Sequence, residues 1–201
     1  MSHWLDEEEQ RNNPERKAAE KANLVNRKRQ EVSDNYTQIA VRYNAFLEEL
    51  YHLTERVNKL PAETRAAFGK IDGRSKDSHL GNHLNIFSSS RRISKTSFLK
   101  FLSFFSGTRY KNTRVAYIYV SSKPGLVDVE IKELLFLRIS RKDDKSAIDP
   151  EKANQKLTHF ISSVPVEMLD HNFALSLIDW FAFKCDSADC KAISYLKKME
   201  V

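Results

Sequence analysis

The sequence predicts an α+β fold: a long N-terminal helix with coiled-coil-like heptads, a small central antiparallel sheet and C-terminal helices. A stripe of apolar or small residues, at alternating steps of three and four, runs from Ala18 to Leu60 and predicts the helix. Apolar residues at every position from 115 to 120, and at every second position from 127 to 131, predict strands. The chain contains only five Gly and five Pro, which disfavours an all-β protein with many tight turns.

The long helix is expected from Pro14, which suits a first turn, to Leu60, where Pro61 stops it. Its stripe is small or charged as far as Arg29 and bulky from Val32 onward. The bulky members are Val32, Tyr36, Ile39, Tyr43, Phe46, Leu50, Leu53, Val57 and Leu60. We therefore expect a projecting arm followed by a half that packs on a globular body.

This helix is too long for the rest of the chain to cover. At 1.5 Å per residue it would extend for about 69 Å, whereas the remaining residues would form a body of about 37 Å in diameter. We predict a flexible lead-in at 1–13, the helix at 14–60, and an α+β globular domain at 61–201 packed on the second half of the helix. The overhang favours a homo-oligomer, with the interface at Val25, Val32, Tyr36, Ile39 and Tyr43. Whether the stripe pairs between chains or within one is left open.

The middle of the chain predicts short elements. We expect a short helix at 62–68, a polar loop at 69–83, a short strand at 84–87 and an amphipathic helix at 94–105. Residues 114–121 and 127–131 alternate as strands, and Lys123-Pro124-Gly125 between them favours a type II turn. The apolar run from Leu134 to Ile139 fits either a strand or a helix.

After a charged linker at 140–149, the sequence predicts three helices. Asp149-Pro150-Glu151 is a start signal for a helix reaching about Ser162, and Pro165 starts a second that reaches about Lys184. A third is expected from about Ser187 to Lys198. The second helix is apolar nearly all round, so we expect Asp179 on it to need an ion-pair partner.

The net charge of +6 is concentrated in one third of the chain, because residues 61–125 contain 12 basic and 3 acidic side chains. Such a surface attracts phosphates, anionic lipid or an acidic protein. We predict an anion-binding site where Ser88–Arg92 meets the N-terminus of the helix at 94–105. Its candidate residues are Ser89, Ser90, Arg91, Arg92, Arg109, Lys111 and Arg114.

Catalytic and metal-binding motifs are not evident in the sequence. It contains no Gly-rich phosphate loop, no zinc-type cysteine pairing and no esterase-type serine elbow. His79 and His83 are four apart, but Gly81 between them favours a loop over a metal site. Cys185 and Cys190 are too few for a disulfide scaffold, so a cytoplasmic protein with reduced thiols is expected. No run of 18 apolar residues predicts a membrane span.

These patterns predict a non-enzymatic binding or scaffold protein without a cofactor. It would self-associate through the long helix and engage an anionic partner through residues 88–114. A nucleic-acid-binding protein is the alternative, and an enzyme with an unrecognised site comes third. An acidic protein and a nucleic acid are the favoured partners. The Phe-rich face predicted at 94–105 also fits a membrane surface, which is favoured less.

Overall fold

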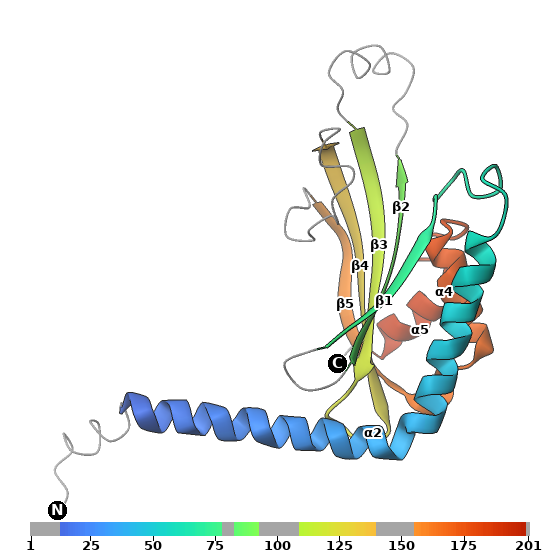
Figure 1. The fold of residues 1–201 in the computed structure, drawn as a ribbon. Helices are drawn as coiled ribbons and strands as arrows, with labels where there is room; N and C mark the ends of the chain where they lie inside the picture. The colour runs from blue at the N-terminus through green and yellow to red at the C-terminus, as the bar shows by residue number, and fades with distance from the viewer. Residues whose placement is uncertain (1–12, 78–82, 93–108, 140–154, 200–201) are drawn as a thin grey trace, which may run out of the picture.

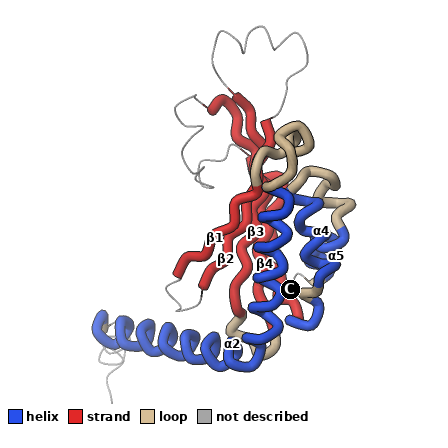
Figure 2. The backbone as a smooth tube through the Cα atoms, turned by 45° about the vertical axis from the view of Figure 1, so that its right-hand side comes forward, coloured by secondary structure: helices blue, strands red, loops and turns tan. Residues whose placement is uncertain are grey.

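The computed structural model describes residues 13–77, 83–92, 109–139 and 155–199. Over these residues the predicted α+β fold is confirmed, with a long N-terminal helix, an antiparallel sheet and C-terminal helices. The sheet has five strands in chain order, β1-β2-β3-β4-β5, and each is antiparallel to the next. Helices α4 and α5 and the second half of α2 lie on the same side of the sheet (Figures 1 and 2).

Helix α2 (Pro14–Asn58) begins with Pro14 in its first turn, and the side chain of Asn13 caps it by accepting from the Glu15 amide at 2.9 Å. Figure 1 shows that α2 bends in its middle, so that its first half runs away from the sheet as an arm. The Thr37 hydroxyl donates to the Ser33 carbonyl at 3.0 Å, a bond that often bends helices. Buried residues on α2 begin at Val32.

The turn between β3 (Arg109–Val120) and β4 (Leu126–Ile139) is held by Asn35 from α2. The Asn35 amide donates to the carbonyls of Ser121, Lys123 and Leu126 at 2.8–2.9 Å, and its oxygen accepts from the Gly125 amide at 2.8 Å. Gly125 has a φ of +74°, which suits the third position of the predicted type II turn. One buried side chain thus joins the helix to the sheet.

Strands β1 (Ile71–Asp77) and β2 (His83–Arg92) replace the loop and short strand expected from the sequence. In β1 only Ile71 is a buried apolar residue, because β1 is an edge strand paired on one side. The segment Ser88–Arg92, expected to precede a helix, instead continues β2 and pairs with β3. The helix predicted at 94–105 lies outside the described residues. The helix expected at 62–68 is also wrong, since the structure has a series of turns there.

Strand β5 (Gln155–Pro165) stands where a helix was predicted as far as about Ser162. Its inward residues Phe160, Ser162 and Val164 alternate with outward ones, a period that sheet pairing satisfies and a helix would not. The open choice at Leu134–Ile139 is resolved as strand, because β4 continues to Ile139. Its pairing with β5 shifts register at Glu133/Leu134, where β5 has one extra residue, Leu157.

The C-terminal helices are shorter than expected. A 3-10 turn, η3 (Val166–Met168), precedes α4 (His171–Phe181), which Asp170 caps by accepting from the Phe173 amide at 2.8 Å. The last helix, α5 (Lys191–Lys198), begins after Cys190 instead of at Ser187. The expectation of a buried Asp179 is wrong, because this residue is exposed.

The main core lies between the helices and the sheet. It includes fully buried Leu50, Phe87, Ile118, Ile131 and Trp180. A smaller apolar cluster, made of Ile86, Val115, Leu134 and Phe136, lies on the opposite face of the sheet. Burial on both faces explains why residues 115–120 of β3 and 134–137 of β4 are apolar at every position.

Candidate anion-binding site

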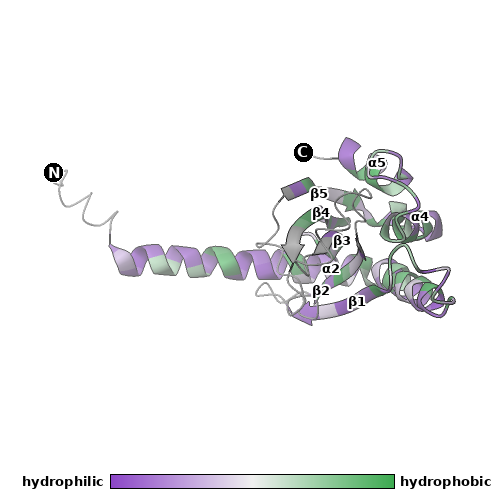
Figure 3. Ribbon diagram, turned by 90° about the horizontal axis from the view of Figure 1, so that it is seen from above, coloured by the Kyte–Doolittle hydropathy of each residue, from purple (hydrophilic) through white to green (hydrophobic). Residues whose placement is uncertain are grey.

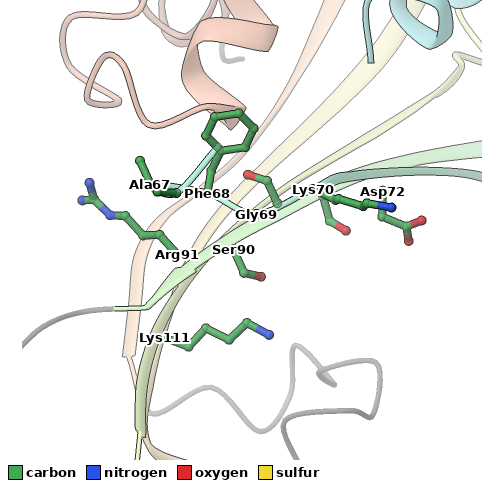
Figure 4. A pocket seen from close by; sticks show the side chains of 11 residues that line it. Ala67, Phe68, Gly69, Lys70, Asp72, Ser90, Arg91 and Lys111 are labelled. Atoms are coloured by element: carbon green, nitrogen blue, oxygen red, sulfur yellow. The ribbon is translucent and has the colours of Figure 1, made fainter. Parts of the chain in front are cut away.

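A recess of about 510 Å³ lies at the end of β2, between that strand, β3 and the turn that follows α2. Its charged lining residues are three cations, Lys70, Arg91 and Lys111, and one carboxylate, Asp72. Figure 4 shows Ser90 between Arg91 and Lys111. The full lining is Ala66, Ala67, Phe68, Gly69, Lys70, Asp72, Ser88, Ser89, Ser90, Arg91 and Lys111. The recess therefore combines an excess of positive charge with hydroxyl groups.

One wall of the recess is the turn at 61–70, which is fixed from both ends. The Asn58 side chain at the end of α2 donates to the Ile71 carbonyl at 2.7 Å and accepts from the Ile71 amide at 2.9 Å. Arg65 donates to the carbonyls of Leu60 and Gly69, at 2.9 and 2.6 Å. Phe68 is buried in the main core. These contacts hold Lys70 beside β2.

The other wall is the end of β2, which extends beyond its partner β1. Pairing with β1 stops at Ser89, whereas pairing with β3 continues to Arg92. The Ser90 hydroxyl lies 3.1 Å from that of Thr113 on β3. The Arg91 guanidinium stacks 4.5 Å from the centre of the Phe183 ring. Stacking uses the face of a guanidinium, whereas anions bind its N–H edge. Stacking on Phe183 therefore leaves the N–H edge of Arg91 able to bind an anion.

A buried polar cluster lies under this part of the sheet. Arg114, which is 1% exposed, donates from Nε to Glu133 at 3.0 Å and from Nη1 to the carbonyls of Trp180 and Cys185 at 2.5 and 2.8 Å. Its guanidinium also stacks 4.3 Å from the Phe183 ring centre. The predicted role of Arg114 in binding an external anion is therefore replaced by a structural one, because its charge is already neutralised internally.

Glu133 completes the cluster with hydrogen bonds on both carboxylate oxygens. Burial by itself would raise the pKa of Glu133, but hydrogen bonds from Ser187 (2.7 Å) and Asn112 (2.9 Å), together with the Arg114 charge, hold that pKa below its usual value. Ser187 in turn accepts from the Trp180 indole at 3.0 Å. The cluster therefore links β3 and β4 to the segment between α4 and α5.

The structure brings four of the predicted anion-binding residues to the recess: Ser89, Ser90, Arg91 and Lys111. The Ser89 hydroxyl is already used, since it donates to the Phe181 carbonyl at 2.5 Å. Arg92 and Arg109 belong to β2 and β3, but their side chains lie outside the described residues. Sequence reasoning missed Lys70, whose only signal was a place in a segment expected to be a polar loop.

Most residues of the predicted oligomer interface pack against other parts of their own chain. Val32, Ile39 and Tyr43 are 2–5% exposed because they pack in the main core. The Tyr43 hydroxyl donates to the Ile118 carbonyl at 3.3 Å and accepts from Asn85 at 3.1 Å. These three residues are therefore not available to a second chain. Tyr36 is 39% exposed, and Val25 on the arm is partly exposed.

Cys185 and His83, two of the residues singled out in the sequence, do not line the recess. Burial and the nearby Cys190 raise the pKa of Cys185 to about 12, so its thiol is protonated at neutral pH and a weak nucleophile. His83 pairs with Asp77 at 2.9 Å, and His79 lies outside the described residues. In the described ranges, no three His, Cys, Asp or Glu side chains gather where a metal could bind. No described helix has both the length and the apolarity that crossing a bilayer needs.

Comparison of the chain with models of protein families, with curated proteins and with solved structures finds no match. The function is therefore argued from the geometry of the recess.

Proposed function

We propose that this chain is a non-enzymatic binding protein that holds an anionic group of a partner in the recess at the end of β2. The observation that carries the proposal is that Lys70, Arg91 and Lys111 line one recess together with Ser88 and Ser90. The three cations come from the turn after α2, from β2 and from β3. Charge-assisted hydrogen bonds from such groups are the usual means of holding a phosphate or carboxylate.

Binding is favoured over catalysis by the chemistry of the lining. The residues around the recess include no His and no Cys, and Asp72 is the only carboxylate among them. A nucleophile with a positioned base, or a pair of carboxylates, is what acid–base or covalent catalysis requires. The lining is suited instead to recognition of negative charge.

The test compares two double variants by fluorescence anisotropy with a labelled acidic peptide and a labelled single-stranded DNA. Lys70→Ala/Arg91→Ala removes two recess cations, whereas Lys191→Ala/Lys198→Ala removes two exposed cations of α5 and serves as the matched control. We expect at least tenfold weaker binding for the first variant only. Equal binding by both double variants would show that the recess is not the site.

A nucleic-acid partner is the second candidate, and the arm of α2 is the observation that favours it. Residues 14–31 contain six basic and three acidic side chains. Lys17, Lys21 and Lys28, at spacings of four and seven, share one face of this exposed helix. For a nucleic acid, affinity should fall steeply with salt, and losing each phosphate contact should flatten the slope by about one unit. A Lys21→Ala/Lys28→Ala variant that leaves the slope unchanged would argue against it.

The proposal includes self-association through α2, but only through its exposed first half, the arm. Leu24 is 54% exposed there, and Val25 lies beside it. A charge at Leu24 should separate chains that associate in this way.

A further inference from the structure

Three polar side chains that line the recess have no partner in the part of the chain that the structure describes. They are the Lys70 ammonium, the Asp72 carboxylate and the Ser88 hydroxyl, and none of them makes a hydrogen bond or an ion pair with another described residue. The Ser89 hydroxyl, by contrast, is used by the fold, since it donates to the Phe181 carbonyl. The first three groups are therefore able to bind a ligand without breaking a contact of the fold.

Strand pairing places two of these groups next to each other. Asp72 on β1 is the direct cross-strand partner of Ser88 on β2, so their side chains lie on the same face of the sheet. Lys70 comes just before β1, and Figure 4 shows Lys70 and Asp72 on the same side of the recess. Strand β1 is mostly hydrophilic (Figure 3), and both charged residues are exposed to solvent. A ligand could therefore reach a cation, a hydroxyl and a carboxylate together.

The carboxylate restricts which anions suit the recess. Asp72 attracts a positive group of a ligand and repels a negative one. It lines the recess together with three cations, so the charges of the lining are three positive and one negative. The complementary ligand carries several negative charges and one ammonium group. A ligand with negative charge alone would leave the carboxylate of Asp72 facing a like charge.

We propose that the recess binds a phosphorylated amino acid, a small molecule with a phosphate, a carboxylate and an ammonium group. This inference rests on the anion binding proposed above and adds the group that Asp72 selects. Lys70 and Ser88 donate to an anionic group of the ligand, and Asp72 accepts from its ammonium. Arg91 and Lys111 supply further positive charge. A volume of about 510 Å³ is within the usual range for small-molecule sites.

The experiment compares two ligands that differ in one group. Phosphoserine carries the ammonium, and phosphoglycerate, phosphorylated at the same carbon, carries a hydroxyl in its place. Isothermal titration calorimetry of the full chain at low salt measures both affinities. The wild type should bind phosphoserine about tenfold more tightly, the effect expected of one charge-assisted hydrogen bond. Asp72→Asn should remove this preference by weakening phosphoserine binding and strengthening phosphoglycerate binding.

Three further variants serve as controls. Asp77→Asn removes the same charge from the other end of β1, outside the recess lining, and should keep the preference. Asp72→Glu keeps the carboxylate and should retain part of the preference. Lys70→Ala should weaken both ligands by a similar factor, because the two share the anionic groups. All of these positions are exposed, and far-UV circular dichroism checks that each variant is folded.

Two results would overturn this inference while leaving anion binding in the recess intact. One is equal affinity of the two ligands for the wild type, and the other is a preference that Asp72→Asn leaves unchanged. Failure of both ligands to bind the wild type would also overturn it. The anisotropy experiment with Lys70→Ala/Arg91→Ala then shows separately whether the recess binds anions at all.

Discussion

At the residue scale, two buried polar side chains determine how the helices join the sheet. Asn35 satisfies four backbone groups of the β3–β4 turn from a position on α2. Arg114 satisfies carbonyls of the segment after α4 from a position on β3. Buried polar groups are costly unless paired, so each of these contacts specifies one arrangement of its two elements.

We expect Asn35→Leu to lower the free energy of unfolding by about 2–4 kcal/mol, because three carbonyls and one amide lose their partner. Asn26→Leu, at an exposed position on the arm, should change it by less than about 0.5 kcal/mol. Urea denaturation followed by circular dichroism measures both. Similar values for the two variants would mean that water replaces Asn35 at the turn.

The Glu133 carboxylate should make stability depend on pH in the acid range. Its folded pKa lies below the usual value of 4.5, so its contribution is present at neutral pH and is lost as the pH falls below 4.5 through the folded pKa. Glu133→Gln should cost about 3–5 kcal/mol at pH 7, because it leaves Arg114 buried without its counter-charge. The difference between wild type and variant should shrink by pH 3. A constant difference from pH 7 to pH 3 would contradict the ion pair.

At the element scale, α2 combines a packed half with an exposed arm. Phe46 and Leu50 are 4% and 0% exposed, and Phe46 makes an edge contact with Phe173 of α4 at 6.0 Å between ring centres. Residues 14–24 are exposed throughout. Helix stability in such a chain comes from packing of an apolar face, so the two halves should respond differently to substitution.

We expect Phe46→Ala or Leu50→Ala to cost about 2–5 kcal/mol, since each would leave a cavity in the main core. Ala22→Ser on the arm should lower the free energy of unfolding by less than about 0.5 kcal/mol. Thermal unfolding of the three variants beside the wild type provides the comparison. Equal shifts in the midpoint at the two ends would contradict the division.

At the scale of the whole molecule, the recess and strand β5 lie at different parts of one sheet. The recess is at β2, and β5 is the outermost strand on the far side from β1. The contacts that build the recess also join α2, the turn at 61–70 and β2, so ligand binding should stabilise the fold.

Inorganic triphosphate, as a compact polyanion, should raise the thermal midpoint of the wild type. At a concentration 100-fold above the dissociation constant, binding only to the folded state adds about 2.7 kcal/mol. Lys70→Ala/Arg91→Ala should abolish the increase, and Lys191→Ala/Lys198→Ala should retain it. An increase that is the same in all three proteins would indicate a general ionic effect instead of a site.

The sequence by itself determined the elements whose signals are local. The apolar stripe at steps of three and four set the helix from Pro14, and alternation with Pro124-Gly125 set the β3–β4 hairpin, because both patterns depend only on neighbours along the chain. The concentration of basic residues in 61–125 also pointed to the part of the chain that contributes Arg91 and Lys111.

Only the tertiary structure decided what depends on distant partners. β5 reads locally as the continuation of a helix start at Asp149-Pro150, and it became a strand because the edge of β4 offered a ladder of backbone hydrogen bonds. Lys70 lines the recess because the Asn58 side chain hydrogen-bonds both backbone groups of the next residue, Ile71. Arg114 and Arg91 look alike in sequence, but Arg114 on β3 faces Glu133 and is buried with it, whereas Arg91 at the open end of β2 reaches the surface. Long-range pairing decides which strands lie side by side. It therefore also decides which charged side chains neutralise one another, and the local sequence pattern does not encode this.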